Sequence, residues 1–293
     1  MKTHNIWGIF AISPSPQSPP SRGGEVQTSR LDEEMILDQI IETKKEEVMR
    51  LKNTTTISAL RNTIAGLAPC RDFQAAISGK ACSIIAEVKC ASPSRGKLVL
   101  HFDPLGIAKT YEQNGAAAIS VLTDEKYFCG HKTYLTQIKK ERKIPVLRKD
   151  FIIDPLQIYE TRAIGADAVL LIVRVLGQRL KEFIALSKEL GLSPLTEVHT
   201  QEELETALAA GADIIGINNR NLDTFVTDIN VSLILKRQIP ADKTVVAESA
   251  VRSRADIECL MQADINAFLI GEALVTAPDI GKKLREFLGE IQE

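Results

Sequence analysis

The sequence has few of the residues that metal sites and disulfide frameworks require. Its 293 residues include four histidines and five cysteines. No cysteines follow the CxxC spacing and no histidines follow the HExxH spacing, so the common zinc-site patterns are absent. An odd number of thiols also does not fit the paired cysteines of a small secreted scaffold. We therefore expect a cytoplasmic protein with reduced thiols, no bound metal and no organic cofactor.

The sequence also lacks an excess of positive charge and a long apolar run. Its formal net charge is -2, so no overall basic field indicates nucleic acid as a partner. The apolar segment 6–12 is too short to cross a membrane. It could belong to a signal peptide, although the segment is weak and no clean cleavage site follows. We expect residues 1–30, rich in Pro, Ser and Gly, to form a disordered leader, or to precede a native start at Met35.

A regular alternation of strands and helices is present after this region. Residues 32–52 first form an amphipathic helix, with Leu37, Ile40, Ile41, Val48 and Leu51 near one face. From residue 82 the chain contains short apolar segments whose near-continuous hydrophobicity is typical of parallel strands buried on both faces. The eight predicted strands are Ser83–Lys89, Ala117–Leu122, Ile144–Lys149, Ala168–Val173, Pro194–Val198, Ile214–Asn218, Thr244–Ser249 and Ala267–Gly271.

Helix signals separate these strands. Asp103-Pro104 and Asp154-Pro155 each place an N-cap before a proline at the first helical position. Thr200 with Glu203 predicts a capping box, in a helix that stops at Gly211. Eight alternating units favour a closed barrel over an open doubly wound sheet, and no GxGxxG motif follows the first strand. The sequence thus predicts an α/β fold, one (β/α)₈ TIM barrel over residues 31–293 with an extra N-terminal helix.

Polar residues interrupt the predicted strands at their carboxyl ends. Glu87 and Lys89 are two residues apart and so point to the same side of the first strand. The others are Lys149, Glu197, Asn218, Arg220, Glu248 and Ser249. A single buried charge can be a structural ion pair, and Glu248 is the strongest candidate for that role, through a rim lysine. A ring of charges at the carboxyl end of a barrel indicates an active site.

These residue types leave two reactions open. Crowded lysines and glutamates can split their pKa values and supply an acid and a base near neutral pH. Proton transfer on a bound sugar phosphate is one possibility, and Schiff-base chemistry through Lys89 or Lys149 is the other. No Ser-His-Asp or Cys-His nucleophile is evident. Gly271 at the end of the last predicted strand is compatible with a phosphate held on backbone N–H groups. The segment Ser92–Gly96 is either a plain surface loop or a mobile cover of the site.

At this point the residues resemble a known family. The segment Ile85-Ala86-Glu87-Val88-Lys89, followed by Ser92-Pro93-Ser94 and Gly96, is similar to the first-strand signature of indole-3-glycerol phosphate synthases. Later segments resemble its other motifs, in order: Lys149-Asp150-Phe151, Glu197-Val198-His199, Ile217-Asn218-Asn219-Arg220-Asn221-Leu222, Glu248-Ser249 and Leu269-Ile270-Gly271-Glu272. The resemblance covers roughly residues 33–290, and the ordered set of motifs is specific where one motif would be weak.

The resemblance implies a substrate and a set of roles. The substrate would be 1-(2-carboxyphenylamino)-1-deoxyribulose 5-phosphate, which undergoes ring closure, decarboxylation and dehydration. Lys149 would be the general acid, Glu197 the acid or base of the dehydration, and Glu87 and Asn218 positioning groups. Lys89 would hold an anionic group. The implied substrate-binding residues are Ser92 and Arg220 at the carboxylate, Phe151 on the aromatic ring, Ser249, Ala250, Gly271 and Glu272 at the phosphate, and also Glu248 and Leu269.

Two positions depart from the family pattern. Ala250 replaces a glycine, and its methyl group restricts the backbone, so we expect weaker phosphate binding at most. Arg174 follows the fourth strand where an apolar or small residue is expected, and it is either a rim ion-pair partner or an extra anion contact.

Other functions remain open at this point. One is another phosphate-binding barrel enzyme, such as a Schiff-base aldolase or a sugar-phosphate isomerase, and another is an inactive binding barrel. We expect a monomer or weak homodimer, a small sugar-phosphate substrate, no nucleic-acid or membrane partner, and no second enzyme fused behind the last helix.

Overall fold

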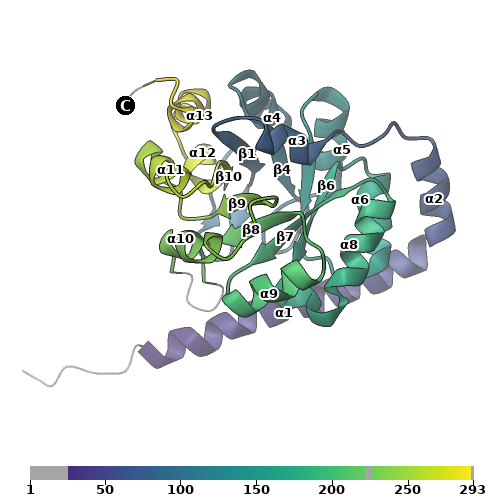
Figure 1. Cartoon of the computed structure of the whole chain (residues 1–293). Coiled ribbons are helices and arrows are strands. Elements are labelled where there is room, and N and C mark those ends of the chain that lie inside the picture. Colours follow the sequence, from purple (N-terminus) through teal and green to yellow (C-terminus); the bar gives the residue numbers. More distant parts are fainter. Residues whose placement is uncertain (1–25, 222–225, 292–293) are drawn as a thin grey trace, which may run out of the picture.

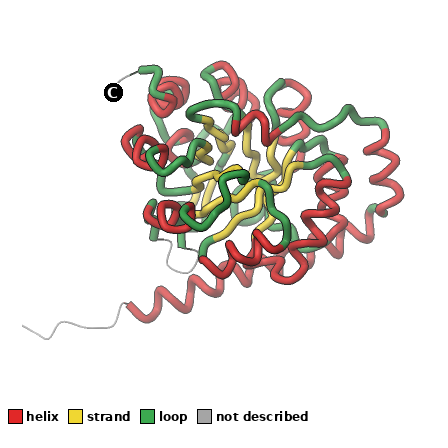
Figure 2. The backbone as a smooth tube through the Cα atoms, viewed as in Figure 1, coloured by secondary structure: helices red, strands yellow, loops and turns green. Residues whose placement is uncertain are grey.

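The computed structural model describes residues 26–221 and 226–291 and shows a closed barrel of eight parallel strands surrounded by helices (Figures 1 and 2). The barrel order is β1-β10-β9-β8-β7-β6-β5-β4, so the first strand pairs with the last. The barrel strands are β1 (Ser83–Val88), β4 (Ala118–Leu122), β5 (Val146–Lys149), β6 (Ala168–Ile172), β7 (Ser193–Val198), β8 (Ile214–Asn218), β9 (Thr244–Glu248) and β10 (Ala267–Ile270). The predicted (β/α)₈ barrel is confirmed, with strand ends within two residues of those expected.

Helices on the outside follow the strands, and up to β10 they lead from each strand to the next parallel strand, as expected. They are α4 (Pro104–Gln113), α5 (Lys132–Glu141), α6 (Pro155–Ala163), α7 (Val173–Leu176), α8 (Leu180–Glu189), α9 (Gln201–Ala209), α10 (Asn230–Lys236), α11 (Arg254–Met261), α12 (Glu272–Val275) and α13 (Ile280–Leu288), with a 3₁₀ turn at Gly177–Arg179. The predicted N-caps are confirmed: the carboxylates of Asp103 and Asp154 accept backbone N–H groups at the starts of α4 and α6.

The barrel interior is arranged in layers along each strand. Because strand side chains alternate, every second residue points inward. Ile85, Leu147, Leu195 and Val246 belong to one buried apolar cluster inside the barrel. Two residues further toward the carboxyl end of the same strands, the sequence places charged side chains on the same face. The apolar layer therefore forms a floor, and the charged residues stand above it.

Helix α3 (Phe73–Ser78) closes the amino end of the barrel. Phe73 and Ile77 are fully buried and pack in the same interior cluster as the inward strand residues. The Asp72 carboxylate caps this helix by accepting the backbone N–H of Ala75. Because α3 closes the amino end, the barrel interior is open only at the carboxyl end.

Two further helices precede α3 in the chain. Helix α1 (Val26–Thr54) runs along the outside of the barrel, and α2 (Ile57–Ala65) packs against α6 (Figure 1). The predicted amphipathic helix is present but begins at Val26, so the expected boundary of the leader at residue 30 is too late. The rest of the expected leader lies outside the described residues.

No helix in the described part of the chain is both long enough and apolar enough to span a membrane.

Candidate active site

Lys149 lies at the centre of the charged layer. It is the last residue of β5, and its Nζ lies 3.5 Å from Glu197 Oε2 and 3.4 Å from Glu248 Oε2. Glu197 and Glu248 are both almost fully buried, on β7 and β9. The expectation that Glu248 pairs with a rim lysine is therefore confirmed, and its partner is the predicted general acid.

The three groups have shifted pKa values that separate their roles. Burial opposes a charge on Lys149, but the carboxylates of Glu248 and Glu197 outweigh it and raise the pKa of Lys149. Burial raises the pKa of Glu248 to about 8, helped by the neighbouring carboxylates and opposed by Lys149. For Glu197, burial is outweighed by Lys149 and His199, which lower its pKa. These directions favour an ammonium on Lys149 and a carboxylate on Glu197, and they make Glu248 release its proton less readily than an ordinary glutamate.

Two glycines, one in β8 and one directly after β10, make room for the inward carboxylates. A Cβ atom on Gly216 of β8 would lie 2.1 Å from Glu248 Oε1, and one on Gly271 would lie 2.3 Å from Glu87 Oε1. Gly271 was interpreted from the sequence as a phosphate-approach position. Its position against Glu87 gives it a second role, and Gly216 was not singled out at all. Each glycine leaves room inside the barrel for a carboxylate from the neighbouring strand.

Lys89 and an aromatic pair form one wall of the site. Lys89 Nζ lies 3.2 Å from Glu87 Oε1 and 5.8 Å from the centroid of the Phe128 ring. The Phe128 and Phe151 rings lie 6.1 Å apart at a tilt of 36°. Phe151 was predicted as a contact to an aromatic substrate ring, whereas Phe128, between β4 and α5, was not. An aromatic residue in an irregular loop leaves no periodic signal that would have identified it.

Asn218 and His199 hold Glu197 from its other side. Asn218 Nδ2 donates to Glu197 Oε1 over 3.3 Å, and His199 Nε2 lies 3.3 Å from the same oxygen. Glu203 Oε2 accepts the backbone N–H of His199 at 2.7 Å and lies 3.1 Å from its Nδ1. The predicted capping box is therefore wrong in one half: Thr200 caps α9, but the Glu203 carboxylate orients His199 instead of returning to the cap. The His199 ring links the charged layer to α9.

The segment after β1 is a short hairpin. Residues Ala91–Ser92 (β2) pair antiparallel with Gly96–Lys97 (β3), so the expected loop Ser92–Gly96 is a turn between two ladder strands. Ser92 is buried, and its Oγ has no hydrogen-bond partner among the described residues. At the tip, Arg95 forms an ion pair with Glu272, which begins α12. This pair ties the hairpin to the rim beyond the last strand.

Glu272 also lies near Arg220, which follows β8. Arg220 Nη2 is 4.0 Å from Glu272 Oε2, and the Arg220 backbone N–H donates to Asn218 Oδ1 at 3.1 Å. Two cations thus face the Glu272 carboxylate. Its side chain is engaged by arginines, which is consistent with a contribution to phosphate binding through backbone alone.

The ends of β9 and β10 form the other side of the rim. Ser249 and Ala250 both have φ of 63°, in the left-handed region that favours glycine. This turn ends β9 at Glu248, one residue earlier than predicted. Gly271 caps the short helix α12 that follows β10, and Leu269 lies in the interior apolar layer below.

Arg174 lies in α7, not at a strand end. It is exposed and lines a hollow together with His199 and Asn218. In the described ranges, no group of three or more His, Cys, Asp or Glu side chains is arranged to hold a metal ion.

Comparisons with known proteins agree with this geometry. Residues 37–287 match the family described as indole-3-glycerol phosphate synthase. A protein of that name from Desulforamulus reducens is 46% identical over 257 residues, covering 87% of this chain and 97% of its own. One from Chlorobium chlorochromatii is 49% identical over 242 residues, covering 81% of this chain and 94% of its own.

Solved structures of lower identity share the barrel. The crystal structure of 3-hexulose-6-phosphate synthase is 16% identical with a TM-score of 0.58, covering 71% of this chain and 99% of its own. A mutant tryptophan synthase alpha-subunit from Pyrococcus furiosus is 14% identical with a TM-score of 0.54, covering 71% of this chain and 98% of its own. At such identities the likeness shows the fold alone. The match to the family over nearly the whole described chain goes further, and the chain belongs to the indole-3-glycerol phosphate synthase family.

Proposed function

We propose that this protein catalyses the indole-3-glycerol phosphate synthase reaction. It would convert 1-(2-carboxyphenylamino)-1-deoxyribulose 5-phosphate into indole-3-glycerol phosphate, carbon dioxide and water, as a carbon–carbon carboxy-lyase of tryptophan biosynthesis. The observation that carries the proposal is the Lys149 ammonium between Glu197 and Glu248, in a chain of this family. The reaction needs one group that gives a proton and one that accepts it, and these residues supply both.

In the first step Lys149 acts as the general acid. The aromatic carbon that bears the carboxylate attacks the carbonyl carbon of the sugar, and the carbonyl oxygen takes a proton from the ammonium. The new carbon–carbon bond forms, and the carboxylate then leaves as carbon dioxide. Two carboxylates beside Lys149 keep it protonated, which supports this role.

The same electrostatics argue against the Schiff-base aldolase. An amine must be neutral to attack a carbonyl, and imine-forming lysines are activated by a lowered pKa. The pKa of Lys149 is raised instead, because its two carboxylates outweigh its burial. A sugar-phosphate isomerase has no comparable supporting observation here, whereas the family match favours the synthase.

In the dehydration half, the hydroxyl takes a proton from the Lys89 ammonium and leaves as water, and Glu197 accepts the proton that is lost from the neighbouring carbon. Its lowered pKa, set by Lys149 and His199 against the effect of burial, keeps it ionised and able to do so. Asn218 holds this carboxylate by a hydrogen bond, and Glu87 holds Lys89. Fixed groups of this kind orient the reacting atoms.

The substrate would lie across the open end of the barrel. Phe151, beside Phe128, would pack on the aromatic ring, and Lys89, Ser92 and Arg220 would bind anionic groups. Backbone N–H groups of Ser249, Ala250, Gly271 and Glu272 would hold the phosphate, with Glu248 and Leu269 beneath. We further propose that the protein works in the cytoplasm, as a monomer or weak homodimer. Light scattering of the purified chain would measure its oligomeric state.

The test is indole fluorescence after mixing purified protein with the carboxyphenylamino-deoxyribulose phosphate. We expect a rise with the wild type and none with Lys149→Ala. Lys149→Arg is the matched control, because a guanidinium keeps the charge but does not release its proton. Equal turnover by Lys149→Arg would contradict the general-acid role. Covalent trapping of substrate by borohydride on Lys149 or Lys89 would instead favour the aldolase.

A further inference from the structure

Helix α1 carries a lysine on its buried face. Ile40, Lys44 and Val48 are spaced four residues apart, so they share one face of the helix, and all three are buried. Lys44 is 0% exposed, although it is charged. A buried ammonium is stable only when it is paired, so its partners define what this helix does for the barrel.

The partners of Lys44 come from two loops at the carboxyl end of the barrel. Lys44 Nζ lies 2.7 Å from Asp124 Oδ2 and 2.9 Å from Asp150 Oδ1. Asp124 follows β4, and Asp150 follows the catalytic Lys149 on β5. A third carboxylate, Glu47 on α1 itself, lies 2.9 Å away. Burial opposes the charge on Lys44, but the two aspartates outweigh it and raise the pKa of Lys44.

Each of these aspartates also fixes the backbone of an aromatic residue in the site. Asp150 Oδ1 accepts the N–H of Phe151 at 2.8 Å. Asp124 Oδ1 accepts the N–H groups of Tyr127 and Phe128 at 2.7 and 3.2 Å. One ammonium on α1 therefore joins the two carboxylates that hold the two facing rings.

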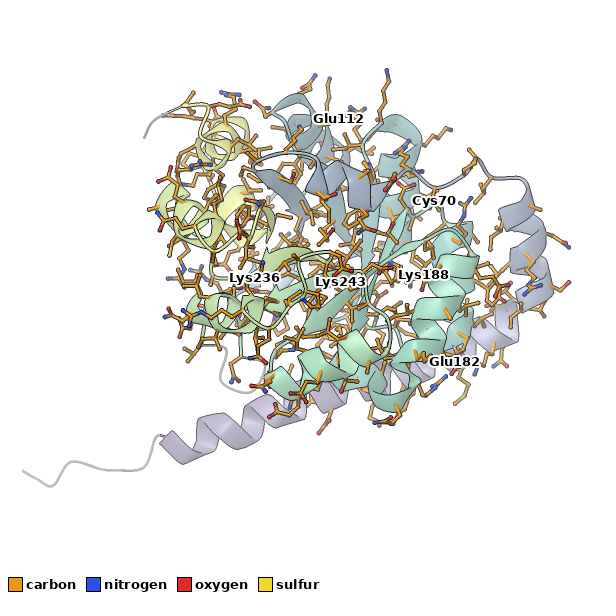
Figure 3. All side chains as sticks on the ribbon, viewed as in Figure 1. Cys70, Glu112, Glu182, Lys188, Lys236 and Lys243 are labelled. Carbon is orange, nitrogen blue, oxygen red and sulfur yellow. The ribbon has the colours of Figure 1, made fainter. Side chains whose placement is uncertain are left out.

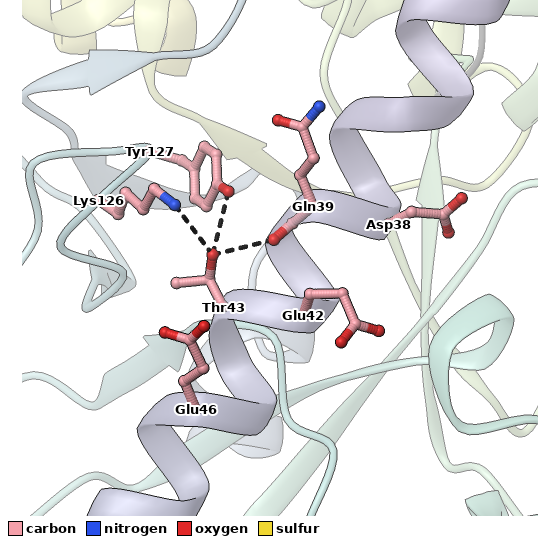
Figure 4. Close-up of a pocket in the computed structure, with 7 residues that line it drawn as sticks. All are labelled: Asp38, Gln39, Glu42, Thr43, Glu46, Lys126 and Tyr127. Carbon is pink, nitrogen blue, oxygen red and sulfur yellow. Dashed lines mark hydrogen bonds between the residues drawn. The ribbon is translucent and has the colours of Figure 1, made fainter.

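The neighbouring residue strengthens the same contact from outside. Thr43 Oγ1 lies 3.1 Å from the Tyr127 hydroxyl and accepts from Lys126 Nζ at 3.2 Å (Figure 4). Asp150 is held independently by Arg148 Nη2 at 3.0 Å and by Thr123 Oγ1 at 2.5 Å. Without Lys44, Asp150 would therefore keep some partners, whereas Asp124 would lose its only ion pair among the described residues.

We propose that Lys44 of the N-terminal helix is a positioning residue of the active site, which sets the separation of Phe128 and Phe151 by joining Asp124 to Asp150. We take this ring pair as the surface that receives an aromatic substrate, and this assignment rests on the proposed function. Lys89 is part of the consequence, because its ammonium lies over the Phe128 ring. Loss of Lys44 loosens this wall while Lys149, Glu197 and Glu248 keep their mutual contacts.

The first arm of the test does not use substrate. Hydrogen exchange is followed by mass spectrometry in peptides that contain residues 124–130 and 150–154, for wild type and Lys44→Met. The control is Lys45→Met, the next residue of the same helix, which removes an exposed ion pair to Glu42. We expect the 124–130 peptide to exchange about tenfold faster in Lys44→Met only, because exchange reports local opening, and the 150–154 peptide to change less, because Asp150 keeps Arg148 and Thr123. Unchanged exchange in Lys44→Met would overturn the proposal.

The second arm measures steady-state kinetics well below the melting temperature. We expect KM to rise about tenfold in Lys44→Met with kcat within about threefold, since binding geometry is lost and the acid and base are kept. A lower melting temperature with unchanged KM would show a merely structural lysine and would also overturn the proposal. If the wild type itself forms no indole, the proposed function fails, and the exchange arm still decides on Lys44.

A second variant covers the case in which Lys44→Met does not fold. Asp124→Asn keeps an oxygen that can accept the Tyr127 and Phe128 N–H groups but removes the ion pair with Lys44. We expect faster exchange in residues 124–130, little change in residues 150–154, and a KM increase in the same direction. An Asp124→Asn protein with wild-type exchange and KM would overturn the link.

Discussion

The two ends of the barrel differ in how completely their carboxylates are paired. At the amino end, Asp167 accepts the backbone N–H groups of Arg71 and Val146 and the Lys139 ammonium, at 2.5 to 2.9 Å. Glu112 accepts the N–H groups of Lys143 and Ile144. Asp213 lies between Lys188 and Lys243, at 2.6 and 3.1 Å. Figure 3 labels Glu112, Lys188 and Lys243 among the side chains of this end.

At the carboxyl end, two inward-facing carboxylates each keep a buried oxygen without a partner. Glu87 Oε2 and Glu248 Oε1 are buried and have no hydrogen-bond partner among the described residues. Leaving such atoms unpaired is costly, so a fold selected for stability alone would pair them. This difference is what we expect if the amino end serves stability and the carboxyl end receives the substrate, as proposed above.

The largest expected effect on activity appears when one lysine at each end of the barrel is replaced and the two variants are compared. Lys149→Met should lower kcat/KM by about a hundredfold to ten-thousandfold, the usual share of a general acid. Lys139→Met should leave kcat/KM near that of the wild type but lower the free energy of unfolding by about 1–3 kcal/mol, because it removes a charged partner of Asp167. Kinetics and urea unfolding of both variants measure this. A catalytic defect in Lys139→Met would break the comparison.

Gly216→Ala should be the next most severe change. The added Cβ would lie 2.1 Å from Glu248 Oε1 and must displace that carboxylate from Lys149. A displacement of about 1 Å in a catalytic constellation can cost about a hundredfold in rate. Steady-state assays of Gly216→Ala and Gly211→Ala provide the matched pair, because a Cβ on Gly211 would meet no atom within 4 Å. Gly211 has a positive φ, so Gly211→Ala shows how much a loss of stability alone changes the activity. A kcat of Gly216→Ala equal to that of the wild type would show that the space beside Gly216 is not needed to position Glu248.

The two ends should also differ in how stability depends on pH. Burial raises the pKa of Glu248 from 4.5 to about 8, so between these pH values the folded protein holds a proton that the unfolded chain has lost. Stability contributed by this group therefore falls as pH rises through that window. For Asp213 the hydrogen bond from Lys188 lowers the pKa, so its contribution is present above the ordinary value and fades as pH falls.

Urea unfolding of Glu248→Gln from pH 4 to pH 8, and of Asp213→Asn from neutral pH down to about pH 2, tests these opposite signs. The stability of Glu248→Gln relative to wild type should increase with pH across the window. Asp213→Asn should be less stable than wild type near neutral pH and approach it as the pH falls. Parallel curves for both variants would contradict the assignment.

The smallest expected effect concerns the strained turn after β9. Ala250 has φ of 63°, where an alanine is disfavoured and a glycine is not. Ala250→Gly should change the free energy of unfolding by less than about 1 kcal/mol, since the relief of strain is partly offset by the greater freedom of the unfolded chain. It should also tighten inorganic phosphate binding slightly, which calorimetry would measure. Unchanged phosphate binding would refute the expectation that the alanine methyl weakens this site.

The sequence predicted the barrel and its charged layer because both follow from periodicity. Alternation along a strand places Glu87 two residues beyond Ile85, and the same rule places Lys149 beyond Leu147. The contacts of Lys44, Phe128 and Gly216 depend on which segments meet in three dimensions, and no local pattern encodes that. The position of Lys44 did carry a signal, because it is a lysine within the apolar face of a helix. Its partners, Asp124 and Asp150, are far away in the sequence, so no local pattern could identify them.

The pairing of β1 with β10 has a consequence for the synthesis of the protein. Glu87 enters the chain early, yet the glycine that gives it room, Gly271, is added close to the end. On a ribosome the barrel cannot close until the last strand has emerged, so a truncated chain lacks a complete site however much of it folds. Enzyme activity therefore requires that translation has passed the final strand. Until then, the inward-facing charged side chains of the first strands remain exposed to water.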